Sequence, residues 1–176
     1  LRANTLIRFA HQLINDGEKN TVRNELYSND KNSLIKRDLE AVADNWRRPS
    51  FEPWEEVEGQ HFFNLMVQRK AMLNGASLAE RMGDKGARDH YLEQAGLMKE
   101  KILEHYHRDK GLIYPTLNRT KGVHYKDSNI DAQVMLAVLH GSVNDGFFDA
   151  NDERVISTAH QIKQYFKNNY RINKLD

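Results

Sequence analysis

The sequence predicts an all-α protein. Apolar residues recur at the three- and four-residue spacings of helices over most of the 176 residues, and strand-like alternation is rare. Glycine and proline fall mostly between the expected helices. No fixed-period repeat is visible, so tetratricopeptide and ankyrin arrays are not supported. A compact bundle and part of a toroid of helical hairpins both fit this pattern.

Two helices are expected before residue 50. One face of the first helix is apolar and is formed by Leu6, Phe9, Ala10 and Leu13. This helix should stop at Gly17, because glycine readily adopts the left-handed conformation that ends helices. The second helix lies within residues 32–46, and Pro49 prevents much continuation beyond it.

Four further helices are expected after residue 60. Residues 61–82 are apolar on most of the helix circumference, which is typical of a helix buried on several sides. A single apolar stripe over residues 91–106 predicts a half-exposed helix. An apolar helix is expected from about residue 128 to 140, and an amphipathic one over residues 155–170. Buried and half-exposed helices therefore alternate along the chain.

The composition limits the protein class. A chain of 176 residues with 39% hydrophobic residues fits one globular domain. The net charge is +1 and the basic residues are scattered, which argues against a nucleic-acid partner. No apolar run is long enough to cross a bilayer, and there is no cysteine for a disulfide or thiolate site. No signal peptide is visible and the chain starts at Leu1, so we expect a processed or cut N-terminus.

An acidic stretch, FEPWEEVEGQHFF, occupies residues 51–63. Glycosidic bond cleavage requires a protonated carboxylic acid beside the leaving oxygen, and Glu55 is a candidate for it. Trp54 and an ionised Glu56 would disfavour the charged form of a neighbouring carboxyl group, whereas a helix beginning near residues 59–60 would favour it. The residues alone do not decide whether the charged form of Glu55 is favoured or disfavoured. They also allow the simpler interpretation that these are acids enriched before a helix start.

The order of residues favours the chemical interpretation. The run PWEEVEGQHFFNLMVQRKAMLNGASLA, residues 53–79, resembles a segment of glucoamylases, glycoside hydrolases of family 15. That segment reads Trp-Glu-Glu-Val, a polar residue, Gly, two further residues and Phe-Phe. The stretches LRANTLIRFAHQLINDG, RDLEAVADNW and SNIDAQVMLAVLHG resemble other parts of these enzymes in the same order. The resemblance covers almost the whole chain, and yeast-type enzymes are the most similar.

This resemblance implies an (α/α)6 barrel, in which twelve helices alternate between two rings. About half of them would lie here, and residues 1–176 would form the central portion of one catalytic domain without an internal domain boundary. The resemblance implies that Glu55 is the general acid, that Glu56 binds hydroxyls of the sugar on the leaving side, and that Trp54 lines the funnel near the cleavage point. The family commonly has Asp-Leu where this chain has Glu52-Pro53, and Pro53 lacks an amide hydrogen for main-chain contacts.

The implied activity is exo-acting hydrolysis of α-1,4-glucosidic bonds in starch and maltooligosaccharides, releasing β-D-glucose with inversion and without a cofactor. An inverting enzyme also needs a carboxylate base, and nothing in this chain matches the family's base. We therefore expect a middle piece of the catalytic domain that is inactive alone and needs the remainder of the polypeptide to complete the barrel. The family and the sequon Asn118-Arg119-Thr120 suggest a secreted glycoprotein.

Two alternatives remain open at this point. A trehalase-like or glucodextranase-like enzyme would use the same fold on another substrate, although the Trp-Glu-Glu-Val run argues against it. A non-enzymatic helical interaction module would instead be insensitive to the replacement of Glu55.

Several other residues have plainer expected roles. His105 and His107 are expected to be solvated side chains on a helix, where a two-residue spacing does not suit joint metal binding, and no metal is proposed. His61 could contact sugar or satisfy the following helix start. Asp127 and Asp131 are expected to cap a helix rather than serve as the base. Four aromatic residues are expected in the core: Trp46, Phe62, Phe63 and Phe166.

Overall fold

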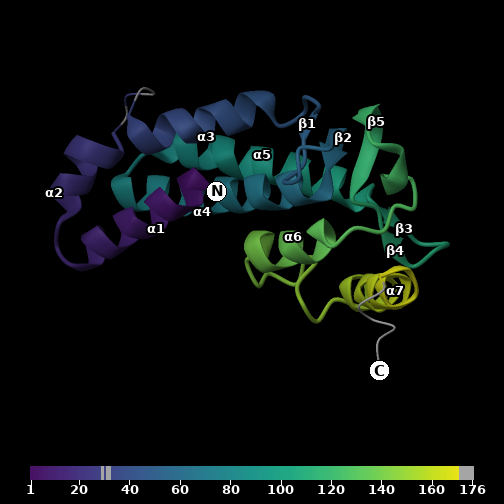
Figure 1. The fold of residues 1–176 in the computed structure, drawn as a ribbon. Helices are drawn as coiled ribbons and strands as arrows, with labels where there is room; N and C mark the ends of the chain where they lie inside the picture. Colours follow the sequence, from purple (N-terminus) through teal and green to yellow (C-terminus); the bar gives the residue numbers. More distant parts are fainter. Residues whose placement is uncertain (29, 31–32, 171–176) are drawn as a thin grey trace. The chain divides into compact units, whose positions relative to one another are not determined.

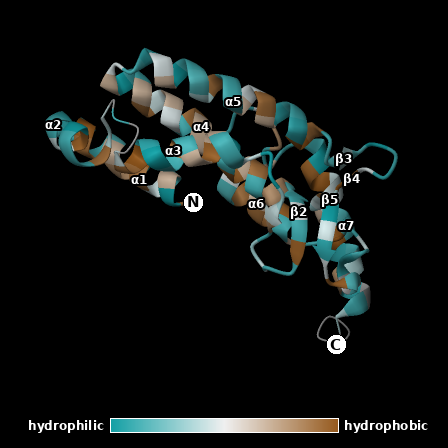
Figure 2. Ribbon diagram, turned by 90° about the horizontal axis from the view of Figure 1, so that it is seen from above, coloured by the Kyte–Doolittle hydropathy of each residue, from teal (hydrophilic) through white to brown (hydrophobic). Residues whose placement is uncertain are grey.

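The computed structural model describes residues 1–28, 30 and 33–170 (Figure 1). Helices make up most of this part of the chain, which confirms the predicted all-α class. They are α1 (Arg2–Asn15), α2 (Lys19–Thr21), α3 (Leu34–Asn45), α4 (Phe62–Met82), α5 (Lys85–Leu103), α6 (Gln133–Gly141) and α7 (Glu153–Asn169), with a π-helical turn η1 (Val22–Leu26) and a 3-10 turn η2 (His124–Lys126). Hydrophobic and hydrophilic bands alternate along these helices, as the sequence spacing predicts (Figure 2).

The chain forms two compact units, and the first consists of residues 1–47 and 68–99. In this unit α1 lies beside α3, and α1 ends as predicted, with Gly17 at a φ of +90°. A side chain at Gly75 would place its Cβ 2.7 Å from Cδ1 of Leu39, so this glycine permits close packing of α3 against α4. The core includes Ile7, Ala10, Val22, Tyr27, Ile35, Leu39, Trp46, Met72, Leu78, Tyr91 and Met98.

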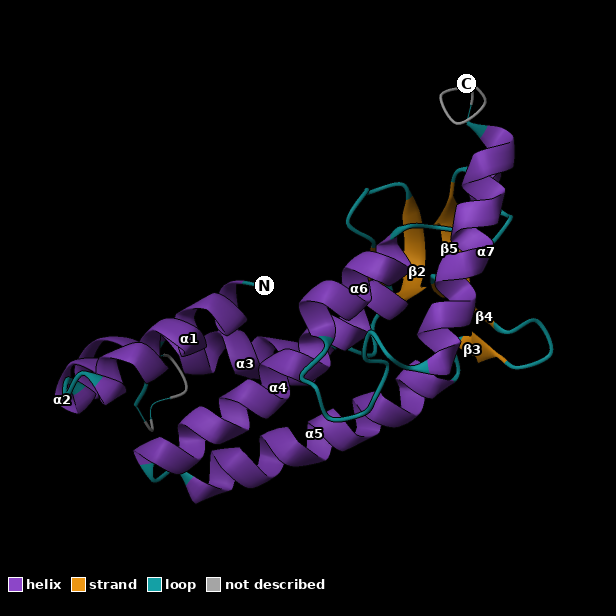
Figure 3. Ribbon diagram, turned by 90° about the horizontal axis from the view of Figure 1, so that it is seen from below, coloured by secondary structure: helices purple, strands orange, loops and turns teal. Residues whose placement is uncertain are grey.

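The second unit consists of residues 48–67 and 100–170 and contains the strands. Strands β1 (Ser50–Phe51), β2 (Val57–His61) and β5 (Thr116–Gly122) form an antiparallel sheet in the order β1-β2-β5. Strands β3 (Tyr106–His107) and β4 (Leu112–Ile113) form a second antiparallel pair. This pair lies beside α7 in Figure 3, and the backbone amide of Ile113 donates to the hydroxyl of Thr158 at 3.0 Å.

These strands and loops correct three predicted helix boundaries. The helix expected near residues 59–60 begins at Phe62, because residues 57–61 pair with β5. A Cβ at Gly59 would lie 2.8 Å from Cγ2 of Thr116, so only glycine lets the two strands approach this closely. Helix α5 ends at Leu103 instead of reaching residue 106, and α6 begins at Gln133 rather than near residue 128.

The core of the second unit lies between the sheet, the start of α4 and the helices α6 and α7. Phe62 is fully buried and meets Phe148 edge-to-face, with 5.2 Å between ring centroids. Phe63 is also buried, so the core predictions for Phe62 and Phe63 are confirmed, as is that for Trp46 in the first unit. None of the helices in the described part of the chain has the length and apolarity needed to cross a membrane.

Candidate active site

The acidic stretch folds into a tight turn between β1 and β2. The backbone amide of Glu55 donates to the carbonyl of Glu52 at 3.0 Å, which makes Glu52–Glu55 a β-turn. Pro53 takes the second position, where its fixed φ suits the turn. Glu55 has a φ of +57°, a left-handed conformation that is costly for a residue with a Cβ. The turn therefore holds Glu55 in a strained and defined backbone geometry.

The side chain of Glu52 organises this turn from inside. Its carboxylate accepts hydrogen bonds from the amides of Trp54 at 3.0 Å, Glu56 at 3.2 Å and Val57 at 3.0 Å. The Glu52 side chain has 0% exposed surface, so these bonds satisfy a buried charge. The three amides belong to residues 54, 56 and 57, so the missing amide hydrogen of Pro53 removes none of these contacts.

Lys126, at the end of η2, joins three carboxylates. Its Nζ lies 2.7 Å from Oε2 of Glu56, 2.9 Å from Oδ2 of Asp131 and 3.3 Å from Oε1 of Glu52. Burial by itself would lower the pKa of Lys126, but the hydrogen bonds to Glu56 and Asp131 and the charges of Asp131 and Glu52 raise it above its ordinary value. Lys126 is therefore a fixed positive charge at neutral pH.

Asp131 connects this cation to Trp54. Its Oδ1 accepts the indole Nε1–H of Trp54 at 3.1 Å and the backbone amide of Gln133 at 2.8 Å. The second bond satisfies the amide of the first residue of α6, but the N-cap of this helix is Ala132, so Asp131 lies one residue before the position that the capping prediction gave it. Burial alone would raise the pKa of Asp131, but the Gln133 amide, Lys126 and Trp54 together hold this pKa below its usual value.

Asp127 does not cap α6, because the helix begins six residues further along the chain. Its carboxylate instead pairs with the guanidinium of Arg119 at 2.5 Å. The prediction for Asp127 was wrong because the helix start was placed too early.

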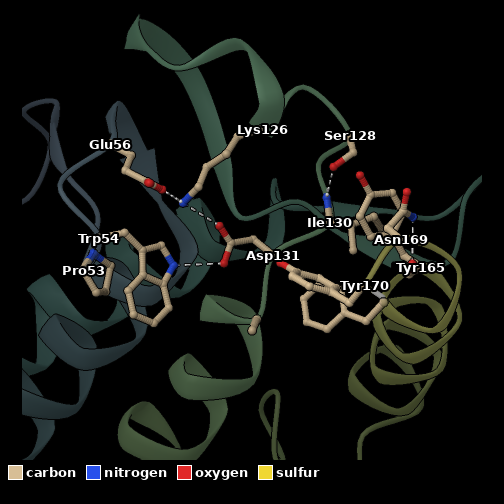
Figure 4. Close-up of a pocket in the computed structure, with 12 residues that line it drawn as sticks. Pro53, Trp54, Glu56, Lys126, Ser128, Ile130, Asp131, Tyr165, Asn169 and Tyr170 are labelled. Atoms are coloured by element: carbon tan, nitrogen blue, oxygen red, sulfur yellow. Dashed lines mark hydrogen bonds and ion pairs between the residues drawn. The ribbon is translucent and has the colours of Figure 1, made fainter. Parts of the chain in front are cut away.

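A cavity of about 860 Å³ opens beside the turn (Figure 4). Trp54 and Glu56 lie on one side with Lys126 and Asp131, and the end of α7 supplies the opposite side. The lining residues are Pro53, Trp54, Glu56, Lys126, Ser128, Ile130, Asp131, Ala132, Tyr165, Phe166, Asn169 and Tyr170. Phe166 is thus partly exposed in this wall, and its predicted place in the core was wrong.

The structure brings two of the three predicted site residues into this cavity. Trp54 is 45% exposed and Glu56 is half-buried, and both line the cavity. Glu55, which lies between them in the sequence, is exposed but does not line the cavity. The helix amides expected near Glu55 are absent there, because β2 separates the turn from α4.

Sequence reasoning missed the contributions of Glu52 and Lys126. Lys126 lies 74 residues from Glu52 along the chain, and no local pattern distinguishes it from a solvated lysine. A weak signal existed at Glu52, because its carboxylate stands where the family commonly has an aspartate.

The two histidines near the sheet are structural. The Nε2 of His61 lies 2.8 Å from the carbonyl of Ser50 and its Nδ1 lies 2.9 Å from the hydroxyl of Thr116. Since a carbonyl only accepts, Nε2 carries the proton and Nδ1 accepts from Thr116. His61 is buried, which favours its packing role over sugar contact.

His105 is fully buried next to Phe62, so the prediction of a solvated helical side chain was wrong. Its chain segment has already left α5 at this point, and His107 lies in β3. The described residues contain no group of three or more side chains suited to hold a metal ion.

Comparison with known proteins decides the family. The model of Glycosyl hydrolases family 15 matches residues 1–175. The chain belongs to this family. It is 40% identical over 178 residues to a glucoamylase of Blastobotrys adeninivorans, covering 97% of this chain and 28% of the relative. It is 37% identical over 140 residues to glucoamylase 1 of Rhizopus oryzae, covering 80% of this chain and 23% of the relative.

The family 15 fold is also found in a solved structure. A family 15 glucoamylase from Hypocrea jecorina superposes with a TM-score of 0.86 at 25% identity, covering 98% of this chain and 28% of that one. The prediction of a fold belonging to the (α/α)6 barrels of this family is confirmed by that similarity. The chain spans about a quarter of the length of the Blastobotrys adeninivorans and Rhizopus oryzae glucoamylases.

Two other matches bear on the alternatives. A trehalase of Mycobacterium tuberculosis is 32% identical over 128 residues, covering 72% of this chain and 17% of the relative. A glucoamylase of Saccharomyces cerevisiae described as intracellular and sporulation-specific is 28% identical over 148 residues, covering 80% of this chain and 27% of the relative.

Proposed function

We propose that this family 15 chain is the central portion of one catalytic domain that hydrolyses α-1,4-glucosidic bonds. The proposed substrates are starch and maltooligosaccharides, attacked from the non-reducing end with release of β-D-glucose. The observation that carries the proposal is the Trp54-Glu55-Glu56 run on a strained turn, with its first and third residues lining a cavity.

In this proposal Glu55 is the general acid that protonates the glycosidic oxygen. Its backbone is held on both sides, because the carboxylate of Glu52 binds the amides of Trp54 and Glu56. Strained residues of this kind are concentrated at functional sites, where the surrounding structure maintains a geometry that the free chain would leave. Glu55 is exposed, so its carboxyl group is accessible to a substrate.

Glu56 and Trp54 would bind the sugar. The carboxylate of Glu56 can accept hydrogen bonds from hydroxyls on the leaving side, and its ion pair with Lys126 at 2.7 Å holds it in place. The indole of Trp54 offers an apolar face, and its bond to Asp131 fixes the orientation of the ring.

We assign the catalytic base to polypeptide outside residues 1–176. An inverting enzyme places its base about 6.5–9.5 Å from the acid, with room for a water molecule between them. Asp131 also belongs to this network, but its oxygens are engaged by Trp54, Gln133 and Lys126. It therefore acts as an anchor in this proposal.

The test uses the longer enzyme, meaning a polypeptide of the relatives' length that carries these 176 residues. Glucose release from a maltooligosaccharide should give the β-anomer in fresh product, read by proton NMR. Glu55→Gln should lower kcat by about 10²–10⁴-fold with the fold intact. Glu58→Gln is the matched control and should keep its activity, because Glu58 lies on β2 and pairs with Lys121 at 3.5 Å. Turnover of Glu55→Gln within about tenfold of the unchanged enzyme removes Glu55 from the role.

A trehalase-like activity is the second candidate, supported by the similarity to the Mycobacterium tuberculosis trehalase. Maltose and trehalose should be offered side by side to the longer enzyme. Hydrolysis of trehalose in preference to maltose would replace the proposed substrate class. A non-enzymatic interaction module would leave both sugars intact and every property unchanged in Glu55→Gln.

Secretion and glycosylation also form part of the proposal. Asn118 is exposed on β5, and its side-chain amide donates to Gln60 at 2.8 Å. Expression in a secreting yeast should give a glycan-sized mass increase that Asn118→Gln removes. An unmodified Asn118 in secreted material would withdraw the glycoprotein assignment.

A further inference from the structure

Lys126 lies within 3.3 Å of three carboxylates. Two of them, Glu52 and Glu56, lie on the turn between β1 and β2, and the third, Asp131, precedes α6. Figure 4 shows the Lys126 ammonium group between the carboxylates of Glu56 and Asp131, with Trp54 turned toward Asp131. A single cation therefore connects segments that are distant in the sequence.

The geometry uses the full donor capacity of the lysine. An ammonium group has three N–H donors, and three carboxylates lie within 3.3 Å of this one. The Lys126 side chain is 17% exposed, so these charge-assisted contacts are screened less than those of surface pairs. The Nζ also lies 5.9 Å from the ring centroid of Trp54.

Glu56 depends most on this arrangement. It makes the shortest of the three contacts with Lys126, at 2.7 Å, and its carboxylate lines the cavity together with that of Asp131. Removing Lys126 would take away the ammonium group that lies within 3.3 Å of Glu52, Glu56 and Asp131, and the three negative charges would repel one another more strongly. The Glu56 side chain would then lose its fixed orientation, which removes a fixed acceptor from the cavity wall.

We propose that Lys126 is a positioning residue that sets the recognition of the sugar on the leaving side, by holding the carboxylate of Glu56 in a fixed orientation. This inference rests on the proposed function. Lys126 does not touch the reacting bond, and its effect passes through Glu56. Loss of Lys126 should therefore weaken hydrolysis only when the substrate carries a leaving-side sugar for Glu56 to bind.

The experiment compares maltose with α-glucosyl fluoride in the longer enzyme. Maltose has a leaving-side sugar, whereas the fluoride has none and its leaving group needs little help from an acid. Lys126→Met should lower kcat/KM for maltose by about 100-fold, as expected when one partner of a partly buried charge pair is removed. The same variant should hydrolyse α-glucosyl fluoride within about threefold of the unchanged enzyme.

Three comparisons make the result specific. Lys121→Met removes an exposed lysine that pairs with Glu58 on the same sheet, and it should leave kcat/KM unchanged for both substrates. Glu56→Gln should reproduce the selective loss on maltose, and adding Lys126→Met to it should cost little more, because the two residues act as one unit. If Lys126→Met does not fold, the same comparison of maltose with α-glucosyl fluoride is made with Lys126→Arg, since arginine keeps the charge and changes the donor geometry.

Equal losses on both substrates in the folded Lys126→Met or Lys126→Arg enzyme would overturn the inference, because the lysine would then act on the turn as a whole. Unchanged kinetics on both substrates would overturn it as well. An unsubstituted longer enzyme that hydrolyses neither substrate would overturn the proposed function itself and this inference with it. A loss confined to maltose supports both.

Discussion

The buried carboxylate of Glu52 accepts the backbone amide of Val57 at 3.0 Å, and this bond closes the turn around Glu55. The same carboxylate also binds the amides of Trp54 and Glu56 and lies 3.3 Å from Lys126. A side chain that stands outside the Trp-Glu-Glu-Val run thus determines the backbone of that run. The stability of the turn should depend on the charge of Glu52.

Glu52→Gln tests that dependence. The substitution keeps the size of the side chain but removes a charge that Lys126 faces and turns an NH2 donor toward backbone amides. We expect the free energy of unfolding of the longer enzyme to fall by about 3 kcal/mol, measured by urea denaturation. Glu58→Gln removes a carboxylate that is 25% exposed and pairs with the exposed Lys121, and it should cost no more than about 0.5 kcal/mol. Equal costs for the two variants would contradict the organising role of Glu52.

A second prediction concerns the backbone of Glu55. Its φ of +57° is costly for any side chain with a Cβ, and glycine adopts it without this cost. Glu55→Gly should therefore be more stable than Glu55→Ala by about 1 kcal/mol, although both lack the carboxyl group. Comparison of the two thermal midpoints isolates the conformational cost, and equal midpoints would show that the turn relaxes once the carboxylate is lost.

The sequence was sufficient for the helices and for the acidic run, because both are local features. The spacing of Leu6, Phe9 and Leu13 encodes a helix face directly, and the stop at Gly17 follows from glycine itself. Strand β2 was missed because its five residues are short of apolar side chains, and its partner β5 begins 55 residues after His61. Pairing over that distance leaves no periodic signal in either segment.

The contacts of Lys126 and Asp131 with the turn could not be predicted from the sequence for the same reason. Lys126 and Asp131 are separated from the turn by about 70 residues, and their burial comes only from tertiary packing. A lysine is ordinarily solvated, so nothing at position 126 itself predicts contact with three carboxylates. His105 illustrates the reverse error, since it was placed on a helix that ends at Leu103.

A third prediction tests the packing of α6 against the start of α4. A Cβ added to Gly141 would lie 2.6 Å from Cβ of Met66 and 2.8 Å from its backbone carbonyl carbon. Backbone cannot move aside cheaply, so Gly141→Ala should destabilise the enzyme by about 1–3 kcal/mol. Gly96→Ala is the control, because Gly96 is exposed within α5 and a Cβ there meets nothing within 4 Å. It should raise stability by up to about 1 kcal/mol, and a similar gain for Gly141→Ala would refute the close contact.

The burial of His105 predicts how stability responds to acid. Its Nδ1 lies 2.8 Å from the carbonyl of Tyr114, so Nδ1 donates its hydrogen and Nε2 is unprotonated in the neutral ring. Burial lowers the pKa of His105 to about 4, and the Tyr114 carbonyl opposes this shift only in part. Burial also lowers the pKa of His61, so protonation of this ring likewise reduces the stability of the folded state as the pH falls.

In the unfolded chain the imidazole of His105 takes up a proton near pH 6.5, whereas in the folded chain it does so only near pH 4. Between these values the unfolded state holds more protons, so the stability that is complete above about pH 6.5 is lost as the pH falls. His105→Asn keeps a donor for the Tyr114 carbonyl and cannot titrate. It should flatten the fall in unfolding free energy between about pH 6.5 and 4 by up to about 1.4 kcal/mol per pH unit, while His61 maintains the remaining slope. Urea denaturation at four pH values measures the slope, with His160→Asn on the exposed face of α7 as the control. An unchanged slope in His105→Asn would mean that the ring accepts its proton without unfolding, and the buried neutral imidazole would then be the wrong description of this core.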